Sequence, residues 1–489
     1  MKWRASRWGG IVVAGGVVSV LAEKPQIDGI FPAGGQHGTE FEVTVIGKFE
    51  PWPLRAVCDE ARISFSPSEK DKGKYQVKVA AEVEPGAYLV RFHNKEGATA
   101  PRQFVVGAQE ERAQVGVETM TIPVADFPLT VNGKLESGGE VDRFAFDLQA
   151  GQVLVAEVTA YALDSPLDPL LHVRGPRGEQ LAFNHDATRL GLDPRLVFTA
   201  PMAGQFELHL SAHAYPPKAD IRFAGSATSI YRLNLGHDPP TIDLPPPHES
   251  ESEGPQRIEI PSSIGGRINP AGDVDRFIFA AKKGEAFSIE VVGTRIGSWI
   301  DPVLVIEDGA GKELKREDDS DGIDRHDVRL DWTAPEEGDY TARVTDLNGN
   351  GGSEIAYQFR IKKPAPGFAA TAPGGVYAIR AGEKLEIAVK VARRDGHKGE
   401  LEVGIKGLPP GVTAAPVAVN EKGEAKLNLE ATAEAALASV AITIWAEPKG
   451  EPEKREQCRF ELKGATTESG HLLINDTERG WLTVLEKKK

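Results

Sequence analysis

The residues best suited to do chemistry in this sequence are the carboxylates of one acidic stretch. The segment EDDSDGIDRHD places six acidic side chains within 11 positions: Glu317, Asp318, Asp319, Asp321, Asp324 and Asp327. Hard oxygen ligands at this density suit Ca²⁺, which takes roughly six to eight of them. An EF-hand is excluded, because Val328 stands where that loop needs a bidentate Glu. The stretch is therefore either a calcium site or a solvated acidic loop.

A second polar loop and a pair of histidines are weaker candidates. The segment DLNGNGGSE alternates oxygen-bearing side chains at Asp346, Asn348, Asn350 and Glu354, although Asn and Gly are also what an ordinary hairpin turn needs. His209 and His213 have the i, i+4 spacing of a metal pair on a helix. They lie in a strand-like segment, where that spacing does not bring two imidazoles together, so we do not expect them to form a metal pair.

The frameworks of common enzymes are missing from the sequence. It contains no G-x-S-x-G, no H-E-x-x-H, no G-x-x-x-x-G-K-(S/T) and no Rossmann glycine fingerprint after a strand. Cys58 and Cys458 lie too far apart in the chain to build a local metal or redox site, and we interpret both as packing residues. We therefore expect a protein that is not an enzyme.

The elements that must position these side chains are strands joined by turns. The 489 residues include 52 Gly and 34 Pro, which disfavours a helical bundle, while 40% hydrophobic content is enough for packed cores. Phe144, Phe146 and Leu148 alternate with polar or small residues, as Phe277 and Phe279 do. The sequence predicts an all-β fold of tandem β-sandwich or jelly-roll and immunoglobulin-like domains.

Two stretches of the chain repeat each other motif by motif. The segment GEVDRFAF, a DP-x-L hairpin and AP-x-x-G-(Q/D)-(F/Y) recur in the same order about 133 residues later. Matched carboxylates recur with them, namely Asp142, Asp168 and Asp186 in repeat 1 and Asp273, Asp275, Asp301 and Asp319 in repeat 2. Their recurrence predicts a shared role, either capping turns or holding Ca²⁺.

Repeat 2 is the more acidic of the two at the position where an ion would bind. It has Glu317-Asp318-Asp319 where repeat 1 has Asn184-His185-Asp186, so an ion should favour repeat 2. The predicted calcium ligands are Glu317, Asp318, Asp319, Asp321, Asp273 and Asp275.

The repeated order of these motifs resembles the bacterial pre-peptidase C-terminal domain. The resemblance covers residues 118–237 and 258–363 and implies a jelly-roll β-sandwich, in some members with structural calcium, with an auxiliary role in secretion, localisation or polymer binding. It does not imply catalysis. Residues 25–107 resemble an IPT/TIG-type immunoglobulin-like domain, and residues 374–464 look immunoglobulin-like. Residues 238–257 and 362–375 are expected to be spacers between sandwiches arranged in a line, and residues 465–489 a C-terminal hairpin or tail.

The N-terminus predicts export. Residues 1–22 combine Lys2, Arg4 and Arg7 with an uncharged apolar run and small residues at Val20 and Ala22, which is typical of a signal peptide. The mature chain is then expected in the periplasm, at the cell surface or outside the cell, without an integral membrane segment. A net charge of −15 disfavours nucleic acid as a partner.

These observations favour a secreted, non-enzymatic protein that binds or scaffolds at the cell surface or on an extracellular polysaccharide or protein. Trp52 and Trp299 are aromatic residues that would stack on sugar rings if exposed, although packing in a core is the alternative for each. Two other functions remain open, an accessory or targeting component of a secreted peptidase system and a purely structural envelope protein. The sequence does not indicate an oligomeric state.

Overall fold

The structure is a computed structural model of the chain. It describes residues 24–114, 116, 119–187, 190–219, 222–237, 244, 249–250, 254–318, 327–461 and 476–487. The predicted signal peptide, residues 1–22, lies outside this part of the chain. Among the described residues, no helix has the length and apolar character needed to cross a membrane.

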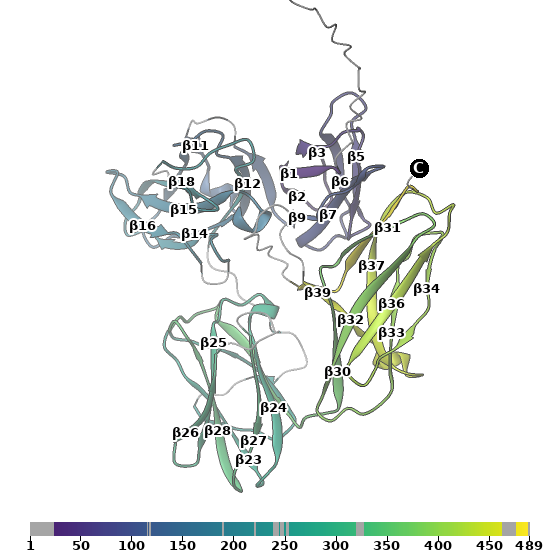
Figure 1. Ribbon diagram of the computed structural model, residues 1–489. Helices are drawn as coiled ribbons and strands as arrows, with labels where there is room; N and C mark the ends of the chain where they lie inside the picture. Colours follow the sequence, from purple (N-terminus) through teal and green to yellow (C-terminus); the bar gives the residue numbers. More distant parts are fainter. Residues whose placement is uncertain are drawn as a thin grey trace, which may run out of the picture.

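The first sandwich packs two sheets face to face (Figure 1). One sheet has the order β1 (Gln26–Phe31), β3 (Glu40–Lys48), β6 (Lys74–Val79) and β5 (Ile63–Pro67). The other has the order β2 (Gly34–Gln36), β9 (Arg102–Gly107), β7 (Gly86–Asn94) and β4 (Arg55–Cys58), with β8 (Gly97–Ala98) paired to β7. The alternation that predicted strands is confirmed, because Val43, Val45 and Phe92 point into the shared core.

The second sandwich contains repeat 1 and is built from two five-stranded sheets. One sheet has the order β10 (Glu110–Ala113), β12 (Leu129–Lys134), β19 (Ile230–Gly236), β14 (Val153–Thr159) and β17 (Arg195–Thr199). The other has the order β11 (Met120–Thr121), β13 (Asp142–Leu148), β18 (Gly204–Ala214), β15 (Leu167–Arg174) and β16 (Gln180–Asn184). The short turns η1 (Val124–Asp126) and η2 (Tyr161–Leu163) are 3₁₀ helices.

The third sandwich contains repeat 2 and has the same strand order as the second. One sheet runs β20 (Glu249–Ser250), β22 (Ser262–Arg267), β29 (Ala356–Lys362), β24 (Ala286–Val292) and β27 (Val328–Thr333). The other runs β21 (Gln256–Arg257), β23 (Asp275–Ala281), β28 (Gly338–Asp346), β25 (Pro302–Asp308) and β26 (Glu313–Glu317), and η3 (Thr294–Ile296) corresponds to η2. The sequence repeat is therefore also a repeat of topology.

The fourth sandwich follows after only residues 363–366. One sheet runs β34 (Val412–Ala414), β36 (Glu424–Ala431), β32 (Lys384–Arg394), β30 (Gly367–Ala372), β39 (Arg459–Glu461) and β40 (Asp476–Thr477). The other runs β31 (Val376–Arg380), β41 (Gly480–Leu485), β37 (Ala438–Pro448), β33 (Leu401–Lys406) and β35 (Val417–Ala418), with β38 (Glu456–Gln457) on β37 and η4 (Pro452–Lys454) beside it.

Two expectations about the segments around the fourth sandwich are corrected. Residues 367–372 of the expected spacer 362–375 form strand β30, which pairs with β32 and β39. Residues 476–477 and 480–485 join the last sandwich as expected, but they do not pair with each other as a hairpin. Strand β40 pairs with β39, whereas β41 pairs in parallel with β31 and antiparallel with β37. Strand β41 thus lies inside the sheet, between β31 and β37, and its Trp481 is fully buried.

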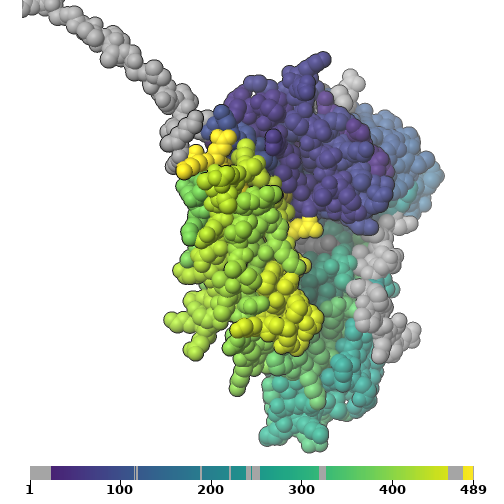
Figure 2. Space-filling view, turned by 90° about the vertical axis from the view of Figure 1, so that its right-hand side faces the viewer, coloured from purple at the N-terminus to yellow at the C-terminus, as the bar shows by residue number. Residues whose placement is uncertain are grey.

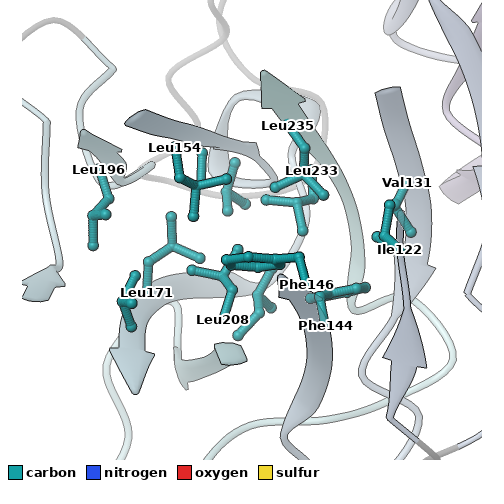
Figure 3. Packing of buried hydrophobic residues seen from close by; sticks show 14 of the residues in the cluster. Ile122, Val131, Phe144, Phe146, Leu154, Leu171, Leu196, Leu208, Leu233 and Leu235 are labelled. Carbon is teal, nitrogen blue, oxygen red and sulfur yellow. The ribbon is translucent and has the colours of Figure 1, made fainter. Parts of the chain in front are cut away.

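The core of the second sandwich shows why the alternating pattern specifies this fold (Figure 3). Side chains from β14, β17 and β19 meet side chains from β13, β15 and β18 between the two sheets: Leu154, Leu196, Leu233 and Leu235 face Phe144, Phe146, Leu171 and Leu208. Glycines predicted to reverse the chain do so at equivalent places, with φ of 79° at Gly151 and 76° at Gly284. Burying two inner faces against each other is the main stabilising contribution of such a sandwich.

The sandwiches close on one another, so the expectation that they lie in a line is wrong. Most of the expected spacer 238–257 lies outside the described residues and stays a prediction. Between the first and second, Arg102 Nη1 lies 2.7 Å from Asp164 Oδ2, and both side chains are almost wholly buried. Between the second and third, Arg195 pairs with Glu354. The fourth sandwich lies against the first (Figure 2). Trp481 packs there on Leu89 and Val57. Buried contacts between distant segments therefore join the four sandwiches into one body.

Candidate functional site

The first carboxylates of the two repeats, Asp142 and Asp275, have a shared structural role. Tyr231 donates a hydrogen bond to Asp142 Oδ2, and Tyr357 donates one of 2.6 Å to Asp275 Oδ2. Burial raises the pKa of Asp142 to about 6, and the hydrogen bond from Tyr231 offsets only part of this effect. Asp275, a predicted calcium ligand, therefore links β23 to β29 through its hydrogen bond with Tyr357.

A second pair of carboxylates caps turns. Asp193 accepts hydrogen bonds from the backbone N–H groups of residues 160, 161 and 162, at 2.8 to 3.0 Å, and holds η2 in place. Asp327 does the same for η3, accepting from Gly293 N and Thr294 N at 2.7 Å. The last acid of the predicted calcium stretch is thus a buried turn cap rather than an ion ligand.

The loop after β28 is organised by its own hydrogen bonds. The Asp346 carboxylate accepts from the backbone N–H groups of Asp301 and Asn350, both at 2.8 Å. Asn348 Nδ2 donates to Asp301 Oδ2 at 3.2 Å. Glu354, the last candidate in this loop, pairs with Arg195 across the boundary between the second and third sandwiches. This loop therefore serves as a hairpin turn and as an interface.

The remaining predicted calcium ligands do not meet within the described part of the chain. Asp273 Oδ1 accepts from Val274 N at 2.7 Å, and Glu317 lies 3.9 Å from Lys315 Nζ. One group of three possible metal ligands within 4.8 Å of one another exists among the described residues, and it contains none of Asp273, Asp275, Glu317 and Asp318. Asp319 and Asp321 lie outside the described residues, and calcium in repeat 2 stays a prediction.

That group is Asp168, His185 and Asp186, in repeat 1. Asp168 stands on β15, and the hairpin from β15 to β16 returns the chain so that His185 Nε2 lies 2.8 Å from Asp168 Oδ1. His185 Nδ1 lies 3.6 Å from Asp186 Oδ2. The imidazole thus sits between two carboxylates. Burial raises the pKa of Asp168, and the charge of His185 opposes this shift.

A second histidine stands beside this group. His213 on β18 is the cross-strand partner of Asp168, and its ring centre is 6.1 Å from that of His185. His209 and His213 both lie on the extended strand β18, as predicted for the HLSAH segment, and are therefore about 13 Å apart along the strand. The prediction missed that His213 faces a different histidine, and only the register of β15 with β18 reveals this.

The same outer face of the sheet carries a row of rings. Phe183 on β16 and His209 on β18 both pair in register with His172 on the strand between them, β15. The rings of His172 and Phe183 are 4.8 Å apart, and Phe183 is 50% exposed. These residues point away from the core because Leu171 and Val173, their neighbours along β15, point into it.

Repeat 2 has neither feature. By strand register, Val305, Arg316 and Arg343 stand at the positions of His172, Phe183 and His209. The positions of His185 and His213 hold Asp318 and Leu347. The ring row and the histidines are therefore specific to the second sandwich, although the two repeats share a backbone plan.

The two tryptophans considered for sugar stacking are engaged in packing. Trp52 lies among Phe49 and Tyr75, and its Nε1 donates to Ser68 O at 3.1 Å. The Arg195 guanidinium lies over the Trp299 ring at 4.5 Å, at the boundary between the second and third sandwiches. Phe183 is the only aromatic residue among the exposed large hydrophobic residues of the described chain.

Comparisons with known proteins do not assign the chain to a family. No family model matches it, and no curated protein matches it. Among solved structures, the pre-peptidase C-terminal domain of a collagenase from Bacillus anthracis matches with 16% identity over 24% of this chain and 100% of that domain, at a TM-score of 0.18. The four N-terminal immunoglobulin domains of Dscam1 isoform 8.4 match with 11% identity over 95% of this chain and 98% of theirs, at a TM-score of 0.18.

Another similar structure is that of SGBP-B from the mixed-linkage glucan utilization locus of Bacteroides ovatus, in complex with a mixed-linkage heptasaccharide. It matches with 9% identity over 69% of this chain and 74% of its own, at a TM-score of 0.17. At such scores the likeness carries no argument about function. The strand order of its sheets shows that the chain is an all-β protein of tandem β-sandwiches. The pre-peptidase C-terminal and IPT/TIG assignments stay predictions.

Proposed function

We propose that this chain is a secreted, non-enzymatic scaffold that binds an extracellular polysaccharide on the outer face of its second sandwich. The observation that carries the proposal is the row formed by the exposed ring of Phe183 and the partly buried imidazoles of His172 and His209 across β16, β15 and β18. A flat aromatic side chain with polar neighbours suits a sugar. The C–H face of the sugar packs on the aromatic ring, while the sugar hydroxyls form hydrogen bonds with the polar groups.

The polar neighbours needed for such binding lie beside the middle ring and beside one end of the row. Gln180 Oε1 lies 3.0 Å from His172 Nδ1, and Glu207 Oε2 lies 2.8 Å from His209 Nε2. These groups hold the imidazoles in place and still face solvent, so they can exchange hydrogen bonds with hydroxyl groups. The position of β16 at the edge of its sheet leaves one side of the row open (Figure 1).

The closed body supports a scaffolding role. Interfaces such as Arg102 with Asp164 fix the sandwiches relative to one another, so a surface on one sandwich keeps its orientation to the others. Preorganised surfaces bind with a smaller loss of entropy than flexible ones. We infer export from the predicted signal peptide, whose residues lie outside the described chain.

The test is retention of the chain on insoluble polysaccharides, with collagen-coated beads as the protein arm. We expect retention on at least one polysaccharide and a loss of at least about fivefold for Phe183→Ala, since a central aromatic contact is typically worth 1 kcal/mol or more. Met202→Ala is the matched control, because Met202 is a similarly exposed apolar residue, at 46%, in the same sandwich.

Three results would count against the proposal. Retention on collagen alone would assign the chain to a protein partner. Equal loss for the Phe183 and Met202 variants would remove the ring row as the site. A hydrolytic activity abolished by one point mutation would overturn the non-enzymatic interpretation.

A further inference from the structure

We propose that Asp168, His185 and Asp186, with His213 beside them, bind one divalent transition-metal ion such as Zn²⁺. The three residues already place one ligand atom each within 4.8 Å of the others. Imidazole and carboxylate together are the ligand set that Zn²⁺ takes in proteins, at about 2.0 to 2.2 Å from the ion. This inference does not rest on the polysaccharide proposal.

The hairpin geometry makes this group a preformed site. Asp168 is held by its strand, and the register of β15 with β16 fixes Asn184 opposite Leu171, which brings the next residue, His185, back over Asp168. The two atoms in contact, His185 Nε2 and Asp168 Oδ1, are 2.8 Å apart and need to separate only slightly to admit an ion between them. The side chains are partly exposed, so an ion has an open path to the group.

The comparison between the repeats supports a transition metal rather than calcium. Both repeats place a carboxylate at the start of the hairpin strand, Asp168 or Asp301. Only repeat 1 combines it with two histidines, and in repeat 2 Asn348 bonds to the carboxylate instead. Calcium prefers oxygen ligands, whereas imidazole selects zinc, copper or nickel. The histidines thus change the ion that this position accepts.

A bound ion would also fasten the connection from β16 to β17. This connection begins at the group, continues to Asp193, which caps η2, and ends at Arg195, which pairs with Glu354 of the third sandwich. Tying its first residues to Asp168 should restrict residues 190–194, because Asp193 already holds that end of the connection. We therefore expect the ion to stabilise the boundary between the second and third sandwiches.

The experiment is a titration of the full chain with Zn²⁺ alone, followed by native mass spectrometry and calorimetry. We expect one ion bound at this site, and at least about tenfold weaker binding for His185→Gln and for Asp186→Asn, since loss of a metal ligand or its partner commonly costs that much. His237→Gln is the matched control, because His237 lies in the same sandwich and packs on Phe127, away from the group. A hundredfold excess of Ca²⁺ should leave Zn²⁺ bound.

Hydrogen exchange provides a second readout that does not depend on the affinity of a variant. Zn²⁺ should slow amide exchange in peptides covering residues 190–199 of the wild-type chain and leave the same peptides unchanged in the His185→Gln variant. Equal Zn²⁺ affinity in wild type and His185→Gln, or displacement of Zn²⁺ by Ca²⁺, would overturn the proposal. Because no polysaccharide is present, neither result bears on the ring row, and Phe183→Ala should bind Zn²⁺ as the wild type does.

Discussion

Replacing Asp164 by Asn tests whether buried charge pairs join the sandwiches into one body. Asp164 and Arg102 are 5% and 3% exposed, and their side chains meet at 2.7 Å. The change keeps the shape of the side chain. It also keeps the backbone, because φ at this position is 60° and Asn tolerates that conformation as well as Asp does. The variant therefore removes only the negative charge.

The expected cost follows from what remains buried. Arg102 would keep hydrogen bonds to Ile27 O, at 3.1 Å from Nε and 2.5 Å from Nη2, but would have no countercharge at contact distance. Removing one partner of a buried pair typically costs about 3 to 5 kcal/mol, and the remaining hydrogen bonds place this case near 3 kcal/mol. Burial lowers the pKa of Arg102, because taking its positive charge out of water costs free energy. The Asp164 carboxylate offsets part of that cost in the wild type.

The assay is hydrogen exchange of the full chain, read in β9 and η2, because four sandwiches need not unfold in one step. Glu430→Gln is the control. It breaks the pair of Glu430 with Lys384, whose side chains are 56% and 76% exposed, and should cost less than about 1 kcal/mol. Adding Arg102→Met to Asp164→Asn should recover part of the loss, because no uncompensated charge then stays buried. Equal effects of the Asp164 and Glu430 variants would refute the reasoning.

Two further predictions concern buried side chains. Asp142→Asn should flatten the pH dependence of stability. The pKa of Asp142 in the folded protein, about 6, exceeds its ordinary value of about 4, so the folded state binds the proton more tightly. The free energy of unfolding of the wild type should therefore fall by up to about 3 kcal/mol as pH rises from 4 to 7, and that of the variant should not. Calorimetry at both pH values measures this, and identical slopes would contradict it. Trp481→Ala should cost about 3 to 5 kcal/mol and separate the fourth sandwich from the first, since Trp481 is fully buried against Leu89. Trp481→Phe should cost much less, because the buried Nε1 has no hydrogen-bond partner, and small-angle scattering that shows both variants equally compact would contradict the interface.

Local patterns in the sequence were sufficient to predict the sandwiches. Alternation along a strand assigns each side chain to one face, which is why Phe144, Phe146 and Leu148 could be placed in a core without knowing their partners. The glycines at residues 151 and 284 could be placed in turns because glycine readily adopts the positive φ that these turns need, whatever residues lie around it in the fold. Matching motifs in matching order then gave two sandwiches of equal strand order.

The candidate site was only partly predictable. Asp168 and Asp186 were recognised as recurring carboxylates, but charge density pointed to repeat 2 for an ion. A count of acidic residues does not show which carboxylates already accept hydrogen bonds from the protein. Asp327 caps a turn, and Asp275 accepts a hydrogen bond from a tyrosine. The hairpin register, which brings His185 onto Asp168, is not visible in composition.

The sequence by itself determined the strands, the turns and the repeat, because each depends on residues close together in the chain and on a periodicity of two. The tertiary structure alone decided how the sandwiches meet. Arg102 with Asp164, Arg195 with Glu354 and Leu89 with Trp481 are separated by 62, 159 and 392 positions, and no local pattern marks any of them as partners. Such contacts form only when folded surfaces come together and exclude water, so they belong to the assembled molecule.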